Sequence, residues 1–339
     1  MNHQQATNRL MVVVPLYNEE EVIIEFQQRL SAVLRHLPVE TETLYVNDGS
    51  TDGTRKLLQK IQLSSPNDIS IINFTRNFGK EVAISAGLDH VDADAIIVID
   101  ADLQDPPELI PNMLLEWRRG FDVVCMQRSH RQNEGFFKRN TARLFYRLIA
   151  HLGSINIPAN VGDFRLLSRR AVMSLRQLPE RTRFMKGLFA WIGYPTITLK
   201  YHRSIRNAGK TKFRLNHLTS LALDGVTSFS TTPLRLASYA GILVSFFSFA
   251  YGTYIIGKAA LFGDPVAGFP SLIATITFIG GMQLLAIGLL GEYLGRIFIE
   301  TKQRPLYLVE TYQPAKQIKH RDFIDDKPRQ FISTHVEPG

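Results

Sequence analysis

The sequence predicts a doubly wound, mostly parallel α/β sheet followed by amphipathic interfacial helices and a two-helix transmembrane hairpin. Three observations support this fold class. Strand and helix patterns alternate through roughly the first 110 residues, stretches without a charge cover residues 236–257 and 265–291, and two basic amphipathic segments lie between these parts. Alternating strands and helices are typical of parallel sheets. An uncharged apolar stretch of ~20 residues or more is typical of a membrane-spanning helix.

The strands and helices of the first part follow from short apolar runs. Apolar side chains recur at helical spacing from Glu20 to Leu37, and Ala95–Ile99 forms a buried strand that runs into Asp100. Pro106-Pro107-Glu108 indicates the start of the next helix. The other expected elements are strands over 10–16, 44–46 and 69–74 and helices over 54–63 and 80–90.

The two uncharged stretches are expected to cross the membrane as helices over 236–257 and 269–291. The connector between them is short and rich in turn-forming residues, so both ends of the pair lie in one compartment. Arg296, Lys302 and Arg304 follow the second span, and the positive-inside rule places these ends in the cytoplasm. Buried helices of a soluble core are the alternative, although such helices rarely run this long without a charge.

The composition limits the class of protein and its partners. Of 339 residues, 45% are apolar and 21% are charged, which excludes wholesale disorder. The net charge of +8 leaves nucleic acid, an anionic membrane and phosphorylated small molecules as partners. Cys125 is the only cysteine, which excludes an intramolecular disulfide and fits a reducing compartment. The polar N-terminus predicts no signal peptide.

Positive charge is concentrated in two segments. Residues 128–147 hold six Lys or Arg side chains against one acid, and residues 200–214 hold six without an acid. Apolar residues recur at helical spacing over 137–152 and 213–229, which is typical of helices on an anionic membrane surface. Nucleic acid is disfavoured because these segments carry no recognised nucleic-acid-binding motif and flank membrane-directed helices.

Acidic residues stand at the end of a predicted strand. Asp100 and Asp102 flank the small Ala101, so in an extended segment both carboxylates point the same way. Their oxygens suit Mg²⁺ or Mn²⁺, which would offset charge on a diphosphate leaving group. Gln104 is a candidate further ligand. An acidic turn that caps a helix is the alternative, but three other polar strand ends meet the same edge, which favours a metal site.

The other strand ends have individual interpretations. Asp48 directly follows a strand and is expected to hydrogen-bond a nucleobase. Asp52 and Thr54 are expected to form a turn and a helix cap. Tyr17 either packs at the edge of the sheet or forms a surface on which a base stacks.

Together these motifs resemble those of the GT-A nucleotide-sugar glycosyltransferases of family 2. The resemblance rests on Pro15–Glu19, Asn47–Gly53 and Asp100–Asp105, and it extends from about residue 9 to residue 310. Within the family, the chain is most similar to polyprenyl-phosphate glycosyltransferases, and among these to the bactoprenol (undecaprenyl-phosphate) glucosyltransferases of O-antigen modification. The motifs that carry this narrower similarity lie at 74–81, 160–166, 184–187, 228–235 and 290–296.

The resemblance implies roles for individual residues. Arg206 and Lys212 would belong to a loop that closes over the nucleotide diphosphate, and the acceptor phosphate would be held by Arg128, Lys138 and Arg139. The nucleotide-sugar site would comprise Pro15, Tyr17, Asn18, Glu19, Asp48, Lys80, Asp100, Ala101, Asp102, Arg206 and Lys212. The catalytic set would comprise Asp100, Asp102, Arg128, Lys138, Arg139 and Asp163. The metal ligands would be Asp100, Asp102 and Gln104.

The role of Asp163 stays open. It follows an irregular stretch and could act as a base or contact a sugar hydroxyl. An ion pair with Arg165 that only shapes the pocket is the alternative.

The expected activity is transfer of glucose from UDP-glucose to undecaprenyl phosphate, for modification of O-antigen or another cell-envelope glycan. The lipid phosphate is already ionised at neutral pH, so it needs positioning and charge screening more than a general base. In-line attack would invert the anomeric centre. The alternatives are another donor (GDP-mannose, UDP-GlcNAc or UDP-4-formamido-arabinose), a nucleotide-sugar-sensing membrane scaffold, or a lipid flippase, which two spans disfavour because they enclose no polar path.

The expected organisation is a cytoplasmic GT-A domain (1–212), a juxtamembrane amphipathic helix (213–233), the transmembrane hairpin (234–295) and a cytoplasmic tail (296–339). The expected location is a bacterial inner membrane, with both termini in the cytoplasm. Glycines of the second span suit either close helix contacts in a homo-oligomer or ordinary glycine use. The resemblance implies a homo-oligomer, since tetramers occur in the family.

Overall fold

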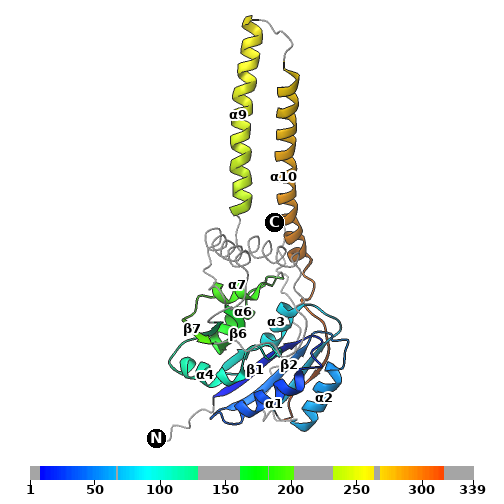
Figure 1. Ribbon diagram of the computed structural model, residues 1–339, viewed down its shortest axis with the longest axis vertical. Coiled ribbons are helices and arrows are strands. Elements are labelled where there is room, and N and C mark those ends of the chain that lie inside the picture. Colours follow the sequence, from blue (N-terminus) through cyan, green and yellow to red (C-terminus); the bar gives the residue numbers. More distant parts are fainter. Residues whose placement is uncertain are drawn as a thin grey trace, which may run out of the picture.

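The chain forms an α/β part from which two long helices project (Figure 1). The computed structural model describes residues 8–65, 68–128, 161–181, 183–201, 232–262 and 268–316. The amphipathic helix expected over 137–152 lies outside these residues, as does the one expected over 213–233 apart from its last two residues, which begin a long helix.

An eight-stranded sheet in the order β7-β5-β6-β4-β1-β2-β3-β8 forms the centre of the α/β part. Its four central strands are parallel to one another: β1 (Arg9–Leu16), β2 (Glu40–Asn47), β3 (Ile69–Phe74) and β4 (Ala95–Val98). The helices that follow the first three are α1 (Ile23–Leu34), α2 (Thr54–Ser64) and α3 (Lys80–His90). The predicted alternation of strands and helices is therefore confirmed.

Strand β2 begins four residues before the predicted strand 44–46, because the polar residue Glu42 near its start has partners on the neighbouring strands. Glu42 is buried, forms an ion pair with Arg9 of β1, and accepts a hydrogen bond from Ser70 Oγ of β3. A buried charge that is paired and hydrogen-bonded avoids most of its desolvation cost.

The outer strands make the sheet mixed. The added strands are β5 (Val123–Arg128), β6 (Val161–Ser168), β7 (Thr196–Tyr201) and β8 (Val309–Gln313). Strand β6 runs antiparallel to β4 and β5, β7 runs parallel to β5, and β8 runs antiparallel to β3. The remaining helices of this part are η1 (Pro107–Leu109), α4 (Ile110–Arg118), α6 (Arg169–Arg176) and α7 (Met185–Trp191).

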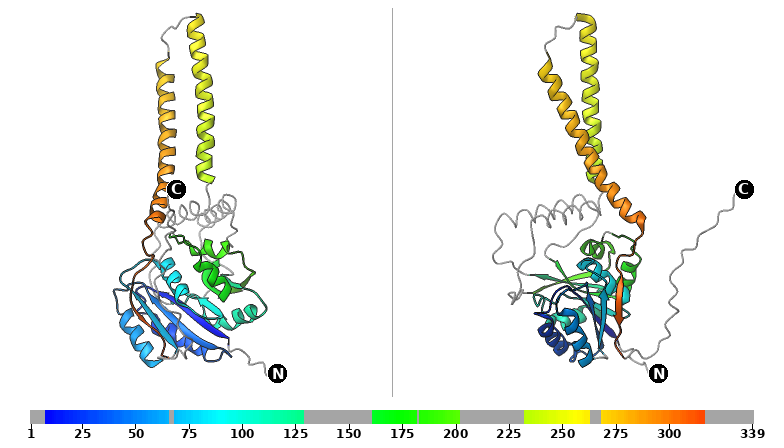
Figure 2. Two further views of the ribbon diagram at one scale, coloured as in Figure 1. Left: turned by 180° about the vertical axis from the view of Figure 1, so that it is seen from behind. Right: turned by 90° about the vertical axis from the view of Figure 1, so that its right-hand side faces the viewer.

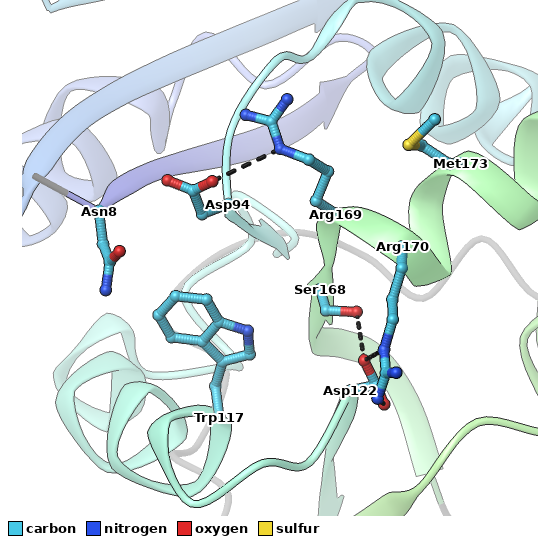
Figure 3. Close-up of a pocket in the computed structure, with 8 residues that line it drawn as sticks. All are labelled: Asn8, Asp94, Trp117, Asp122, Ser168, Arg169, Arg170 and Met173. Atoms are coloured by element: carbon cyan, nitrogen blue, oxygen red, sulfur yellow. Dashed lines mark hydrogen bonds and ion pairs between the residues drawn. The ribbon is translucent and has the colours of Figure 1, made fainter. Parts of the chain in front are cut away.

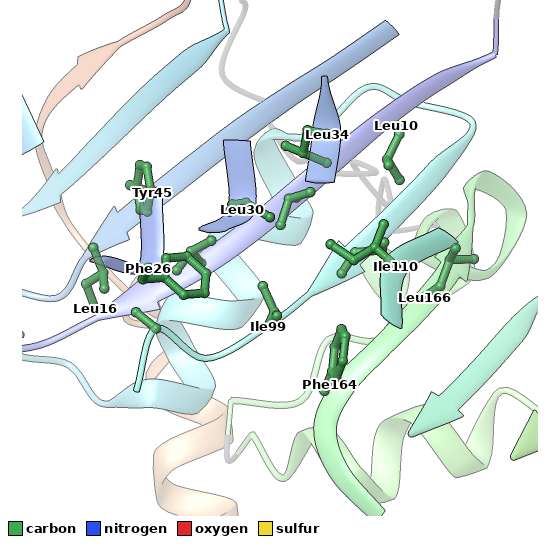
Figure 4. Close-up of a cluster of buried hydrophobic side chains, with 14 of the residues drawn as sticks. Leu10, Leu16, Phe26, Leu30, Leu34, Tyr45, Ile99, Ile110, Phe164 and Leu166 are labelled. Carbon is green, nitrogen blue, oxygen red and sulfur yellow. The ribbon is translucent and has the colours of Figure 1, made fainter. Parts of the chain in front are cut away.

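The core lies on both faces of the sheet. Along β1, Leu10, Val12 and Val14 face one cluster, and Met11 and Val13 face the other, as the two-residue period of a strand requires. Figure 4 shows the first cluster, in which side chains of α1 and α4 meet the strands. The second cluster holds side chains of α3, α6 and α7. Each fully buried large side chain contributes about 1.5–3 kcal/mol.

Helices α9 (Thr232–Phe262) and α10 (Phe269–Lys302) run side by side away from the sheet (Figures 1 and 2). At 1.5 Å per residue they are about 46 and 51 Å long. Within the described residues, one stretch has both the length and the apolar composition to cross a membrane, Phe278–Lys302. It begins later than the predicted second span (269–291), and the first span predicted over 236–257 stays a prediction.

The end of the chain departs from the predicted organisation. Helix α10 continues to Lys302, and part of the predicted tail returns to the sheet as β8 (Figure 2). Arg55 forms two hydrogen bonds of 2.9 and 3.0 Å to Glu310, and Asn73 Nδ2 donates to Thr311 Oγ1 at 2.9 Å. The polar side chains of β8 are accommodated because β8 is an edge strand.

Candidate active site

The candidate site lies at the carboxyl ends of the central strands. The chain adds β2 and β3 on one side of β1 and then returns to place β4 on the other side, so the strand order reverses between β1 and β4. Ligands of doubly wound sheets bind beyond the carboxyl ends at such a point. The segments that carry the predicted residues Pro15–Glu19 and Asp100–Gln104 follow these two strands.

The loops after β1 and β2 are joined to each other. Asn18 adopts a left-handed backbone conformation (φ 55°), and its N–H donates to Ser50 Oγ at 3.0 Å. The Gly53 N–H donates to the Glu20 carboxylate at 2.7 Å. Asp52 accepts the Thr54 N–H at 3.0 Å, which is the expected turn at the start of α2.

Asp48 holds the loop after β3. Its side chain is buried, and its two oxygens accept the N–H groups of Phe78 (2.6 Å) and Gly79 (2.9 Å). Burial raises the pKa of Asp48, and these hydrogen bonds oppose the rise. Gly49 (φ +64°) permits the close approach, because a Cβ there would lie 2.3 Å from the Arg76 carbonyl carbon. The contact to a nucleobase stays a prediction, since these loop contacts already engage both carboxylate oxygens.

Lys80 joins the two carboxylates at the centre of the site. As the first residue of α3, it places Nζ 2.6 Å from Asp100 Oδ2 and 2.6 Å from Asp163 Oδ2. The antiparallel pairing of Val98 with Arg165 accounts for this geometry, because two further residues along each strand bring Asp163 opposite Asp100.

Burial and neighbouring charges oppose each other in the pKa values of this group, and burial raises the pKa of Asp100 although Lys80 opposes the rise. Burial disfavours the ammonium of Lys80, but Asp100 and Asp163 outweigh it and raise the pKa of Lys80 above its usual range. Burial also disfavours the charged form of Asp163, yet Lys80 and Lys186 hold the pKa of Asp163 well below its ordinary value. Asp163 is therefore an ionised acceptor at neutral pH.

Asp163 uses only one of its two oxygens in its contacts with the described residues. Asp163 Oδ1 is buried and has no hydrogen-bond partner among the described residues. A buried acceptor without a partner costs about 1–3 kcal/mol. Burial and the nearby charge of Asp163 raise the pKa of Glu81. The Glu81 carboxylate accepts a hydrogen bond from the Met185 N–H at 2.9 Å. The geometry therefore offers Asp163 Oδ1 as a site for an external donor.

The segment after Asp100 is held in an unusual conformation. Leu103 has a left-handed backbone (φ 59°), and the Gln104 N–H donates to Asp102 Oδ1 at 3.1 Å. Asp105 is buried and accepts a hydrogen bond from the Tyr201 hydroxyl at the end of β7. The turn at Asp102–Gln104 and the contact from β7 to Asp105 thus hold the segment that carries the predicted metal ligands.

The donor set fits a hard divalent cation. Two carboxylates and an amide oxygen are ligands that Mg²⁺ and Mn²⁺ accept, and such ions commonly take their remaining ligands from substrate phosphates and water. Within the described residues, no cluster of three or more His, Cys, Asp or Glu side chains forms a ready metal site. Among the described residues, four acids (Asp100, Asp105, Asp163, Glu81) nevertheless interact with three cations (Lys80, Lys186, Arg165), which leaves negative charge there for a metal to offset.

The other predicted residues are only partly placed. Tyr17 is exposed, as either expected role allows, and Arg128 ends β5 opposite Tyr201. Lys138, Arg139, Arg206 and Lys212 lie outside the described residues. The sequence analysis assigned no role to Glu81, Lys186, Asp105 or Tyr201, although the first three stand in motifs that carried the resemblance.

A hollow of about 440 Å³ lies at the opposite, amino end of the sheet (Figure 3). It is lined by Asp94, Trp117, Asp122, Arg169 and Arg170, among others. Asp122 is paired there with Arg170 and Ser168. This hollow contains none of the predicted site residues.

The mostly parallel sheet with acidic residues at its carboxyl end is a GT-A-like fold. Residues 11–176 match the model of the family described as glycosyl transferase family 2. The chain is 47% identical over 302 residues to the bactoprenol glucosyl transferase of Shigella phage SfV, covering 89% of this chain and 98% of that one. The chain belongs to glycosyltransferase family 2 and is a glycosyltransferase.

Two further similarities were found. An uncharacterized glycosyltransferase of Synechocystis is 48% identical over 303 residues, covering 89% of this chain and 95% of that one. Glucosyl-3-phosphoglycerate synthase from Mycobacterium tuberculosis, solved with Mn²⁺, UDP-glucose and phosphoglyceric acid, is 22% identical with a TM-score of 0.44 and covers 66% of this chain and 78% of that one.

Proposed function

We propose that this enzyme transfers glucose from UDP-glucose to undecaprenyl phosphate at the cytoplasmic face of a bacterial inner membrane. The single observation that carries the proposal is that the carboxyl end of the sheet, where the acidic site lies, is tied to the base of α10 and to the segment that follows it. The Thr75 N–H, directly after β3, donates to the Leu308 carbonyl at 3.1 Å, and the Arg181 N–H donates to Glu300 of α10 at 2.8 Å. A donor site at the foot of a long apolar helix suits a lipid-borne acceptor.

In the reaction, a phosphate oxygen of the lipid attacks the anomeric carbon of glucose. The new carbon–oxygen bond forms as the bond to UDP breaks, and UDP leaves with the electron pair, so the configuration inverts. Asp100, Asp102 and Gln104 would hold a divalent ion that offsets charge on the departing diphosphate. Asp163 Oδ1 would accept a hydrogen bond from a sugar hydroxyl, while Lys80 keeps Asp163 ionised.

The remaining predicted contacts belong to the same proposal. Arg206 and Lys212 would bind the diphosphate, and Arg128, Lys138 and Arg139 the acceptor phosphate. Association with a membrane fits the apolar stretch Phe278–Lys302. A two-span hairpin with both termini in the cytoplasm, and a homo-oligomer of this chain, complete the proposed arrangement.

The test is release of UDP by membranes that contain the full chain. We expect release from UDP-glucose only when polyprenyl phosphate and Mg²⁺ or Mn²⁺ are both present. Activity that excess EDTA leaves unchanged would refute the metal assignment. A panel with GDP-mannose, UDP-GlcNAc and UDP-4-formamido-arabinose tests the sugar, and faster transfer from any of these would replace glucose in the proposal.

A further inference from the structure

Lys80 and the proposed metal both require the carboxylate of Asp100. The ammonium lies 2.6 Å from Asp100 Oδ2, which is the short distance of a charge-assisted hydrogen bond. Asp100 is also a proposed metal ligand. An ammonium and a divalent ion on one carboxylate oxygen repel each other, and the repulsion is strong in a partly buried site.

We propose that Lys80 is an internal competitor of the divalent metal for Asp100, so that metal binding displaces its ammonium from Asp100 Oδ2. The proposal rests on the metal assignment of the proposed function and deepens it. It gives Lys80 a positioning role beyond the nucleotide contact that the family resemblance implies.

The backbone of Lys80 is fixed, whereas its side chain has room to turn. Asp48 holds the N–H groups of Phe78 and Gly79, the two residues before Lys80. The Lys80 side chain is 43% exposed and has four flexible carbons, whereas that of Asp100 is 23% exposed. Release from Asp100 therefore needs no movement of α3.

Asp163 provides the second position that an exchange requires. It lies 2.6 Å from the same Nζ, and its side chain is only 10% exposed. When Lys80 leaves Asp100, its charge stays paired with Asp163, so no buried charge is left without a partner.

The consequence is a site whose metal affinity depends on a second anion. A bare divalent ion must displace the ammonium, whereas an ion that arrives with a diphosphate brings negative charge that the ammonium can also meet. The enzyme would therefore bind the metal with its nucleotide rather than the metal alone.

The test measures Mn²⁺ binding to the full-length protein in detergent, by electron paramagnetic resonance of the free ion, without donor or acceptor. Lys80→Met should bind Mn²⁺ about tenfold more tightly than wild type. Lys80→Arg keeps the charge and should stay close to wild type. Lys186→Met is the matched control, because Lys186 acts on Asp163 by its charge, and it should tighten binding by less than about threefold.

The following results would overturn the proposal. Unchanged or weaker binding by Lys80→Met, or equal tightening by both methionine variants, overturns the competition. No Mn²⁺ binding by wild type or any variant, even with UDP added, overturns the metal assignment as well. Thermal unfolding shows whether Lys80→Met is folded. Mn²⁺ should raise the Tm of Lys80→Met more than it raises the Tm of wild type. If the Tm of Lys80→Met lies below that of wild type and Mn²⁺ does not raise it, the proposal is also overturned.

Discussion

The two ends of the sheet each carry a cluster of charged side chains, and they differ in how these are paired. At the amino end, Asp122 is matched with Arg170 and Ser168, and Arg169 contacts both Asp92 and Asp94. At the carboxyl end, Lys80 is shared by two acids, and one oxygen of Asp163 has no partner among the described residues.

The difference separates a structural cluster from a functional one. The amino end has the hollow, but its acids are matched to arginines, so it offers a ligand little that the protein does not already supply (Figure 3). Within the described residues, the carboxyl end keeps surplus negative charge and an unsatisfied acceptor, which a folded protein tolerates at the expense of stability. An unsatisfied acceptor on an acid that shares a lysine with a second acid therefore distinguishes the carboxyl end, whereas the hollow lies at the other end.

The largest expected effect on the site at the carboxyl end is that of the substitution Asp102→Asn. We expect glucose transfer to fall by roughly 10³-fold, because the loss of an anionic metal ligand removes several kcal/mol of charge stabilisation. Transfer of labelled glucose to polyprenyl phosphate in membranes measures this. The variant should still insert into membranes, and a fully active Asp102→Asn would remove the residue from the mechanism.

The substitution Asp163→Asn sharpens the comparison, because the same change can be made at Asp122. We expect Asp163→Asn to lower kcat/KM for UDP-glucose by about 10–100-fold, the worth of one hydrogen bond to a charged group. Asp122→Asn should lower the Tm and leave the KM for UDP-glucose unchanged. Equal kinetic effects of the two variants would contradict the division between the ends.

Two glycines with positive φ test the positioning of the site. Gly49→Ala and Gly120→Ala both incur the cost of a left-handed alanine, about 1–2 kcal/mol, but only at Gly49 does a Cβ meet backbone, whereas at Gly120 nothing lies within 4 Å. We expect Gly49→Ala also to raise the KM for UDP-glucose by roughly tenfold, which corresponds to about 1.4 kcal/mol. An unchanged KM would show that the Asp48 loop does not position the donor.

The smallest expected effect is the pH dependence of stability at the amino end. The hydrogen bond from Arg170 lowers the pKa of Asp122 below its ordinary 3.8. Burial opposes this shift, and the hydrogen bond from Ser168 adds to it. A lowered pKa contributes stability above the unfolded pKa, and this contribution is lost as pH falls below about 4. As the pH is lowered from 6 to 3, the Tm of Asp122→Asn should fall less steeply than the Tm of wild type. Parallel curves of Tm against pH would contradict the pairing of Asp122.

The sequence analysis succeeded where local pattern determines structure. Apolar runs located β1, β3, β4 and α3, and the position of Asp100 and Asp102 after β4 followed from chain order. Contacts between distant segments could not be predicted in this way. The link from Lys80 to Asp163 joins residues 83 apart through an antiparallel strand, and β8 is a short polar run that forms a strand only because β3 offers an open edge. The roles implied for Arg206 and Lys212 remain predictions.

Strand β8 has a consequence for how the protein is made. It is synthesised after both long helices, so the outer edge of β3 stays uncovered until ribosomes have passed residue 313. An exposed strand edge is a template for aggregation. A chain cut before α9 to obtain a soluble enzyme would therefore lack the strand that protects β3, and restoring residues 303–316 by a linker or as a separate peptide should improve its yield.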